Sequence, residues 1–528
     1  MKGGARGMAG DPKEVPAFRS IADIPFFHGR RRGKKTAVHA YPDDPLSYAD
    51  LDDRSRRFAA FLFARGAIPG DRVAILLQNV SEFVVAYFGS IGAGCLAVPV
   101  NYRLSPPEVG YILSDCSASV VVTTGEQYGK LVRERQGASV STWVLVGDDF
   151  PGTFPFAETL DRDPVPGPAK VDPDDVAVLL YTSGTTGFPK GAMLSHRNTL
   201  FNVSSCRATL SYREDDVGLL SLPLFHVTGL NSQLVALLAC GGTVVLQKEY
   251  DTTRMLELLT RHRATALFFV PAIYKLITLR HDLDRFDLSS ARVAAYGGAP
   301  MAPETIVALG RILPGEFHNC YGLTECSSLG TVLPAENALT HAESVGRPVP
   351  GTLAEVRGPD GRALPPGEIG ELHLQGPHIV RGYFNAPEKT QEAIRDGWLG
   401  TGDVARIDAD GFVYILDRAK DMINRGGEKI YSLEVENVLY TYPGVAEAAV
   451  FGIPHRVFGE VPAARLVPLP GETIDPEKVR AFCRTRLADY KVPVQVEIAD
   501  RIPRNPGGKV LKKELRREWE SRSREDAR

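Results

Sequence analysis

The segment from Tyr181 to Gly191, YTSGTTGFPKG, carries the residue types needed to bind phosphate. Its four serine and threonine hydroxyls and the glycines at 184 and 187 directly follow an apolar run expected to form a strand. Glycines let the backbone approach an anion closely, and hydroxyl and N–H groups can hold phosphate oxygens. The spacing differs from a Walker A loop, GxxxxGK[ST], because the lysine follows Phe-Pro. The pattern predicts a phosphate-binding loop, with a polar surface turn as the alternative. The residues concerned are Thr182, Ser183, Gly184, Thr185, Thr186, Gly187 and Lys190.

Six further short motifs follow this loop along the chain. They are Leu222-Pro-Leu-Phe-His226, Gly298-Ala299-Pro300, Asn319-Cys-Tyr321-Gly-Leu-Thr324-Glu325, Thr401-Gly-Asp403, Asp417-Arg418-Ala-Lys420-Asp421 and Pro503-Arg-Asn-Pro-Gly-Gly-Lys509. In this order, and together with the loop, they resemble the signature motifs of the adenylate-forming enzymes. That family includes acyl-CoA synthetases, firefly luciferase and peptide-synthetase adenylation domains. The resemblance extends from about residue 45 to about residue 515.

The resemblance implies both a fold and a reaction. The implied fold is α/β, with a large multi-subdomain N-terminal domain of layered sheets and a small, mobile α+β C-terminal lid. The implied enzyme is an ATP-dependent acyl-CoA synthetase. It converts a carboxylic acid to acyl-AMP, then forms acyl-CoA and releases AMP. The expected cofactors are ATP, Mg²⁺ and coenzyme A, the expected partners are these small molecules, and a homodimer is left open.

Two of the motifs are implied to hold adenine, phosphate and metal. Glu325 would bind Mg²⁺, a hard cation that prefers oxygen ligands, and Thr324 would contact a nucleotide phosphate. Tyr321 would stack on adenine while Asn319 hydrogen-bonds its edge. The adenine-side loop would consist of Gly298, Ala299 and Pro300. The structural alternatives are a solvated glutamate and an aromatic residue that belongs to the core.

The resemblance assigns the ribose to Asp403 and Arg418. An ionised carboxylate is acceptor-only, so Asp403 suits two ribose hydroxyls. Arg418 would brace the same ribose or a phosphate. A turn-capping aspartate and a structural ion pair are the alternatives for these two residues.

Lys509, Lys420 and a glycine pair are implied to act with the lid. The attack of a carboxylate on the α-phosphate brings two anions together, and Lys509 would supply the neutralising cation. Gly426 and Gly427 match the loop that admits the pantetheine arm of CoA after the lid rotates. Lys420 would be the hinge that absorbs the dihedral change.

The acyl pocket is implied to include His226, Thr228 and Gly229, although a packed core histidine is the alternative for His226. The segment 225–235 has no acidic residue to pair with an amino acid's ammonium, so amino-acid activation is disfavoured. The small residues Thr228 and Gly229 leave room for a chain or a ring. We expect a medium- or long-chain fatty acid. An aryl acid, coumarate- or benzoate-like, is the alternative, and a non-catalytic adenylate-binding protein is the alternative from another class.

These side chains need strands and helices to position them. Apolar runs at 72–79, 119–125, 175–181, 264–270 and 292–298 predict strands, and helical patterns at 106–116 and 302–313 lie between some of them. Apolar strands that alternate with helices are typical of layered α/β folds with buried parallel sheets. The uncharged run 83–100 predicts a buried helix followed by a strand rather than a transmembrane segment. The tail after residue 512 predicts a solvated helix.

Changes in the density of turn residues and in strand spacing along the sequence predict the domain boundaries. Residues 1–417 are expected to form the N-terminal adenylation domain, of which 345–417 is turn-rich and predicts a β-rich subdomain. Residues 418–420 are expected to be the hinge and 421–528 the lid. Within the lid, 446–453 predicts a strand and 475–490 a helix.

Composition excludes several classes of protein. The 61 basic and 64 acidic residues give a net charge of −3, which offers no general attraction to nucleic acid. The seven cysteines are scattered without CxxC spacing, which argues against a zinc site or a disulfide framework and favours a cytoplasmic protein.

Overall fold

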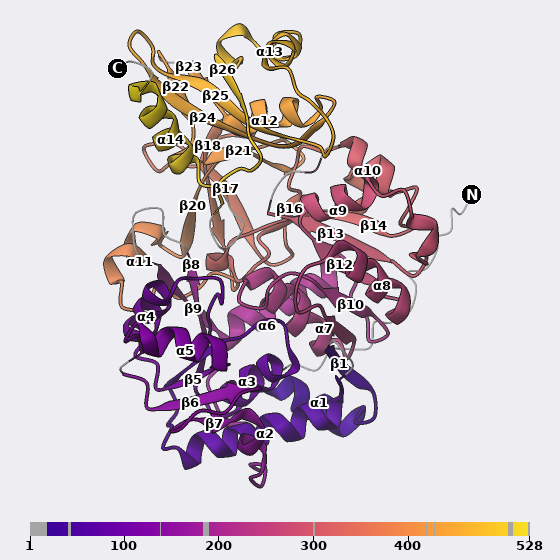
Figure 1. The fold of residues 1–528 in the computed structure, drawn as a ribbon, viewed down its shortest axis with the longest axis vertical. Helices are drawn as coiled ribbons and strands as arrows, with labels where there is room; N and C mark the ends of the chain where they lie inside the picture. Colours follow the sequence, from indigo (N-terminus) through magenta and orange to yellow (C-terminus); the bar gives the residue numbers. More distant parts are fainter. Residues whose placement is uncertain are drawn as a thin grey trace, which may run out of the picture.

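Two large sheets form the N-terminal part of the chain (Figure 1). This computed structural model describes residues 18–40, 44–137, 139–182, 189–298, 301, 303–418, 420–426, 428–504 and 510–525. The seven-stranded sheet has the order β7 (Phe154–Pro155), β6 (Thr142–Val146), β5 (Val120–Thr124), β3 (Arg72–Leu76), β4 (Leu96–Pro99), β8 (Val176–Thr182) and β9 (Lys190–Ser195). The nine-stranded sheet has the order β16 (Arg347–Pro348), β15 (Thr331–Leu333), β14 (Glu316–Tyr321), β13 (Val293–Gly297), β12 (Ala266–Phe269), β10 (Val217–Leu220), β11 (Thr243–Leu246), β1 (Thr36–Ala40) and β2 (Asp44–Ser47).

Both sheets are mixed, whereas the apolar runs of the sequence predict buried parallel strands. Their central strands are parallel, but β9 runs antiparallel to β8, and β14, β15 and β16 are joined by antiparallel pairs. A short loop of seven residues between β8 and β9 permits an antiparallel return, whereas a parallel neighbour requires a long crossover. The predicted phosphate loop therefore connects β8 to its antiparallel neighbour β9, the edge strand of this sheet.

Helices cover both sheets and share one core with them. α2 (Tyr48–Ala64) and α3 (Ser81–Gly92) pack against each other and contribute to an apolar cluster that draws residues from both sheets. The remaining N-terminal α-helices of at least seven residues are α1 (Asp23–Arg31), α4 (Pro106–Asp115), α5 (Gly125–Arg133), α6 (His196–Leu210), α8 (Thr252–His262), α9 (Pro271–Thr278), α10 (Pro303–Leu309) and α11 (Pro387–Ala393). The expected helix at 302–313 ends early, because Gly310 and Pro314 disfavour its continuation. The run 83–100 forms α3 and β4, and none of the described helices is long and apolar enough to cross a membrane.

A third sheet follows the two large ones, within the turn-rich stretch 345–417 for which we expect a β-rich subdomain. It has the order β17 (Leu353–Arg357), β18 (Ile369–Gln375), β20 (Trp398–Ile407) and β19 (Ile394–Arg395), with β21 (Val413–Arg418) paired to β20. Its antiparallel strands pack around a small core of their own.

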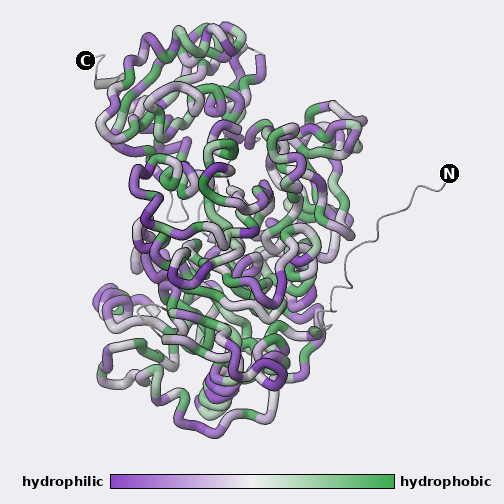
Figure 2. Tube along the Cα trace, turned by 90° about the vertical axis from the view of Figure 1, so that its right-hand side faces the viewer, coloured by the Kyte–Doolittle hydropathy of each residue, from purple (hydrophilic) through white to green (hydrophobic). Residues whose placement is uncertain are grey.

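The C-terminal part has a separate sheet, drawn in orange and yellow at the top of Figure 1. Its order is β23 (Glu428–Ile430), β22 (Ile423–Arg425), β25 (Gly459–Pro468) and β24 (Val445–His455), with β26 (Gln495–Ile498) parallel to β25. Its helices are α12 (Ser432–Tyr440), α13 (Pro476–Arg484) and α14 (Lys512–Glu525). The chain thus changes sheets between β21 and β22, at the position where the hinge is expected. Hydrophobic and hydrophilic stretches alternate along the chain in every part of the molecule (Figure 2).

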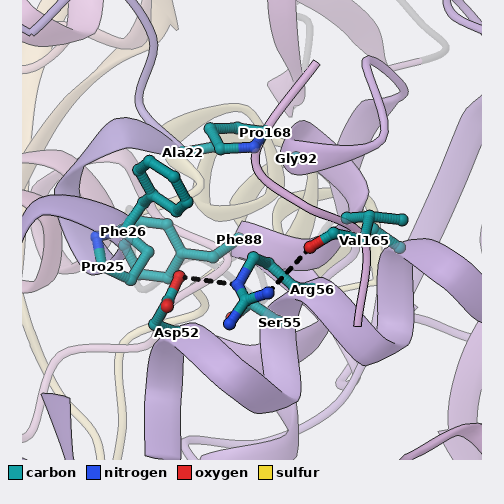
Figure 3. A pocket seen from close by; sticks show the side chains of 11 residues that line it. Ala22, Pro25, Phe26, Asp52, Ser55, Arg56, Phe88, Gly92, Val165 and Pro168 are labelled. Atoms are coloured by element: carbon teal, nitrogen blue, oxygen red, sulfur yellow. Dashed lines mark hydrogen bonds and ion pairs between the residues drawn. The ribbon is translucent and has the colours of Figure 1, made fainter. Parts of the chain in front are cut away.

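One small pocket lies between α1 and α2, far from the motifs described above. Arg56 crosses it, bonded to Asp52 at 3.2 Å and to the carbonyl oxygen of Val165 at 2.8 Å (Figure 3). None of the residues predicted to bind substrate lines this pocket. We therefore read it as a packing gap filled by an ion pair.

Candidate active site

Two predicted nucleotide-binding side chains, Tyr321 and Arg418, contact the buried carboxylate of a third, Asp403. Asp403 on β20 and Arg418 at the end of β21 are cross-strand partners, and Arg418 Nε lies 2.7 Å from Asp403 Oδ1. The hydroxyl of Tyr321, the last residue of β14, donates to Asp403 Oδ2 at 2.5 Å. Burial raises the pKa of Tyr321, and the nearby Asp403 carboxylate raises it further, so the phenol remains a donor.

A β-bulge helps to aim Asp403 into this cluster. The pairing of β20 with β21 shifts register between Val404 and Ala405, and such shifts often redirect a side chain beside an active site. The hydroxyl of Thr401 in the same motif accepts from the Asp403 N–H at 3.1 Å and donates to the Leu372 carbonyl at 2.8 Å. An ionised carboxylate only accepts hydrogen bonds, so ribose hydroxyls are the kind of donor that Asp403 suits.

Asn319 lies two residues before Tyr321 on β14 and is buried. Its Nδ2 donates to the Ser344 carbonyl oxygen at 2.9 Å. One of its two amide hydrogens is therefore used within the protein. A bond from Asn319 to the adenine edge stays a prediction and would use the remaining amide hydrogen or Oδ1.

Glu325 is held by a side chain that the sequence analysis did not single out. Thr324 and Glu325 open a 3₁₀ turn, Thr324–Cys326, and the hydroxyl of Tyr383 donates to Glu325 Oε1 at 2.7 Å. Burial and the Glu325 carboxylate both raise the pKa of Tyr383. No motif spacing reveals this pair, because the two residues are 58 positions apart.

The turn that carries Glu325 is fixed by strained and closely packed backbone. Ser327 and Ser328 have φ of 57° and 115°, a region that non-glycine residues rarely occupy. A Cβ on Gly322 would come 1.6 Å from the Ser328 carbonyl oxygen, so only glycine fits there. Asn231 Nδ2 donates to the Ser327 carbonyl at 3.1 Å, and the Ser232 hydroxyl lies 2.7 Å from that of Ser328. The surrounding structure thus holds a conformation that the turn would not adopt alone.

Asn231 and Ser232 belong to a π-helical segment, Thr228–Val235, that also begins with the predicted acyl-pocket residues. π-Helical turns are frequent at functional sites. Thr228 is half-buried and Gly229 is buried, and a Cβ on Gly229 would come 2.5 Å from the Pro223 carbonyl oxygen. Gly229 therefore permits close packing of this segment, while its place in an acyl pocket stays a prediction.

His226 is exposed to solvent, yet desolvation by the protein around it lowers its pKa. The structure therefore gives His226 neither a packed core environment nor a described ion pair, and its role at the acyl group stays a prediction.

The phosphate loop is anchored at both ends. Thr182 ends β8, Lys190 begins β9, and the two are antiparallel partners. Lys190 Nζ lies 5.2 Å from the centroid of the Tyr383 ring, within cation–π range. Gly298, with φ of 80°, follows β13. Several predicted residues lie outside the described part of the chain: Ser183, Gly184, Thr185, Thr186, Gly187, Ala299, Pro300, Gly427 and Lys509.

The expected hinge and CoA loop lie between β21 and β23. Lys420 is exposed as a whole residue, but partial burial of its ammonium lowers its pKa. The nearby positive charge of Arg418 lowers this pKa further. Gly426 has φ of 61°, and its N–H donates to the Phe458 carbonyl at 2.8 Å. A left-handed residue at this turn favours glycine.

The donor set fits magnesium better than a metal held by protein alone. Among the described residues no group of three His, Cys, Asp or Glu side chains could hold a metal ion. Mg²⁺ is usually held by one or two carboxylates together with substrate phosphates and water. Glu325, fixed by Tyr383 and close in the chain to Thr324, matches that requirement.

A family model described as AMP-binding enzyme matches residues 27–384, and that of the AMP-binding enzyme C-terminal domain matches 434–509. The chain belongs to the AMP-binding enzyme family. This AMP-binding enzyme is 40% identical over 502 residues to a feruloyl-CoA synthase from Amycolatopsis sp, covering 95% of this chain and 99% of the relative. It is 37% identical over 483 residues to a long-chain-fatty-acid–CoA ligase from Mycobacterium tuberculosis, covering 91% and 95% of the two chains.

Solved structures confirm the expected fold of the AMP-binding enzyme. The crystal structure of an anthranilate CoA ligase in complex with anthranoyl-AMP superposes with a TM-score of 0.90 at 26% identity, covering 95% of this chain and 98% of the other. The expectation of an α/β fold with a large N-terminal and a small C-terminal domain is thus confirmed. The chain is an AMP-forming acid–CoA ligase of acyl or aryl acids.

Proposed function

We propose that this ligase activates a medium- or long-chain fatty acid with Mg·ATP and transfers the acyl group to CoA. The observation that carries this proposal is the composition of the segment lining the predicted acyl pocket, 222–235. Its only titratable side chain is His226, whose lowered pKa keeps it neutral near pH 7. A buried second carboxylate or an ammonium on the substrate would find no opposite charge in this segment.

The nucleotide would lie where the buried carboxylate cluster and the turn of Glu325 come together. Asp403 and Arg418 would hold the ribose, and Tyr321 would pack on the adenine. Magnesium, when bound, supplies positive charge that offsets the triphosphate, with Glu325 as its protein ligand. Thr182, Lys190 and the loop between them would hold phosphate oxygens. Lys509 would neutralise the substrate carboxylate as it attacks the α-phosphate, releasing pyrophosphate.

The second half-reaction would use a rotated lid. The thiol of CoA attacks the acyl carbonyl, the bond from carbonyl carbon to the AMP oxygen breaks, and AMP leaves. Gly426 and Gly427 would border the pantetheine arm. Gly426 supports this placement because a glycine presents no side chain at the exposed tip of the β22–β23 hairpin, where φ is positive.

An aryl acid of the hydroxycinnamate type is the second candidate substrate. The specific observation in its favour is the 40% identity to a feruloyl-CoA synthase over 95% of this chain. Thr228 leaves room for either a ring or a chain.

A CoA-dependent AMP assay separates these candidates. We would compare fatty acids from acetate to stearate with ferulate, coumarate and benzoate at equal concentrations. The highest kcat/KM with an acid of medium or long chain supports the proposal, and the highest value with ferulate or coumarate favours the second candidate. Release of ADP, or no consumption of CoA with any acid, would contradict the whole assignment.

A further inference from the structure

Tyr383 contacts both sides of the proposed metal–phosphate site. Its hydroxyl donates to Glu325 Oε1 at 2.7 Å, and its ring lies 5.2 Å from the ammonium of Lys190. Glu325 comes from the turn after β14, whereas Lys190 begins β9 in the other large sheet. One side chain therefore connects the predicted metal ligand with the lysine that ends the phosphate loop.

The backbone around Tyr383 is attached to β9. The N–H of Phe384 donates to the Gly191 carbonyl at 2.8 Å, and the N–H of Met193 donates to the Gly382 carbonyl at 2.9 Å. Ala192 and Tyr383 form an isolated antiparallel bridge between these two bonds. The main chain of Tyr383 is thereby held against β9, the strand that Lys190 begins.

Two more hydrogen bonds hold the main chain of this segment, at Val380 and at Tyr383. The N–H of Tyr383 donates to the Thr390 hydroxyl at 2.9 Å, and the N–H of Val380 donates to the Glu325 carbonyl oxygen at 3.0 Å. Tyr383 thus has its main chain and its side chain both constrained. A carboxylate bonded to such a donor has one preferred orientation. Tyr383 bonds to Oε1, and no described residue is seen to bond to Oε2, so we expect Oε2 to be the oxygen that faces a ligand.

We propose that Tyr383 is a positioning residue that orients the Glu325 carboxylate for Mg·ATP and seats the Lys190 ammonium beside the phosphate loop. The inference rests on the proposed function, in which Glu325 binds magnesium. Partners that orient a metal-ligating carboxylate typically affect metal affinity by about 10- to 100-fold when they are removed.

A direct measurement of metal affinity tests whether the Tyr383 hydroxyl orients Glu325. The protein would be saturated with the nonreactive analogue α,β-methylene-ATP, and Mn²⁺ affinity measured from the EPR signal of free Mn²⁺. Tyr383→Phe keeps the ring and removes one oxygen, so we expect Mn²⁺ affinity to fall by about 10-fold or more. Tyr414→Phe is the matched control, because the Tyr414 hydroxyl donates to Asp408 Oδ2 at 3.1 Å and is not among the residues assigned to the site. It should bind Mn²⁺ as the unaltered protein does.

Glu325→Gln distinguishes failure of this inference from failure of the proposed function. If Glu325→Gln weakens Mn²⁺ binding and Tyr383→Phe does not, the positioning role is wrong while the metal assignment stands. If Glu325→Gln has no effect, both are wrong. The double variant should bind Mn²⁺ no more weakly than Glu325→Gln alone, because the hydroxyl then has no carboxylate to orient. Additive losses would overturn the coupling.

The ring is tested separately. Tyr383→Leu removes the aromatic face as well as the hydroxyl, so in EDTA it should bind α,β-methylene-ATP several-fold more weakly than Tyr383→Phe does. Isothermal titration calorimetry measures this difference without turnover. Equal affinities of the two variants would refute the contribution through Lys190.

Discussion

Single side chains decide whether two anions can approach each other in the first half-reaction. The carboxylate of the acid and the α-phosphate of ATP repel, and the assigned cation at the point of attack is Lys509. One of the described cations assigned to the nucleotide, Arg418, is already paired with Asp403 at 2.7 Å. It is therefore poorly placed to substitute for Lys509.

We predict that Lys509→Ala loses adenylation and keeps thioesterification. Loss of one well-placed stabilising group costs about 10²–10³ in rate, so ATP–pyrophosphate exchange should fall at least that far. CoA transfer from supplied acyl-adenylate should stay near normal, because Lys509 is expected to have left the site by then. Lys513→Ala, an exposed lysine nearby, serves as the control. Equal losses in both half-reactions would argue against a lid that alternates between them.

At the scale of elements, a buried polar cluster ties the lid helices to the hinge strand. Asp417, next to last on β21, accepts from the N–H of Ser432 at 2.5 Å and from its hydroxyl at 2.9 Å. Lys512, the first residue of α14, pairs with Glu436 of α12 at 2.7 Å and also contacts the Ser432 hydroxyl. β21, α12 and α14 thus meet at one group of charges.

We predict that Lys512→Met destabilises the lid by about 3–5 kcal/mol near neutral pH, the usual effect of leaving buried charges without a partner. Burial raises the pKa of both Asp417 and Glu436, and the Lys512 charge is the largest of the influences that oppose this rise. Without Lys512 both values rise further above those of the unfolded chain. The carboxylates then destabilise the fold at high pH, and this penalty disappears as pH falls through their folded-state pKa values.

The destabilisation by Lys512→Met should therefore be largest at neutral and alkaline pH and smaller toward pH 5. Scanning calorimetry of the C-terminal transition at several pH values measures it. Lys513→Met, on the exposed side of the same helix, should change little. A loss that does not vary with pH would mean that Lys512 contributes packing rather than charge.

Elements could be predicted from the sequence where burial leaves a local signal. The runs that became β3, β5, β12 and β13 are largely apolar because parallel strands are covered on both faces. β9 has no such signal, since KGAMLS neither alternates nor is fully apolar. The Tyr383–Glu325 pair and the Asp417–Lys512 cluster join distant segments, and only the folded chain brings them together. The motifs predict most of the candidate site, but the residues that hold the motifs in place have no recognisable spacing in the sequence.

At the scale of the whole molecule, the lid has its own interior. In the described part of the chain, the two apolar clusters of the lid contain only residues from Ile423 onward. Its described contacts with β21 are largely polar, through Asp417 and Ser432. A domain with a separate core and a polar boundary can rotate as a rigid body. The proposed hinge at Lys420 lies between these two regions.

We predict that Lys420→Pro makes acyl-AMP but little acyl-CoA. Proline fixes φ near −65° and cannot move between two backbone states, so the lid should stay in one orientation. The Arg418 carbonyl accepts two hydrogen bonds in this turn, from the N–H groups of Asp421 and Met422. Proline at 420 removes neither donor. Lys420→Ala is the matched control, since it removes the ammonium and keeps the backbone free. Single-turnover experiments should show acyl-AMP accumulating in Lys420→Pro and passing to CoA in Lys420→Ala. If both variants lose thioester formation equally, the ammonium rather than the hinge is responsible, and if neither does, the pivot lies elsewhere.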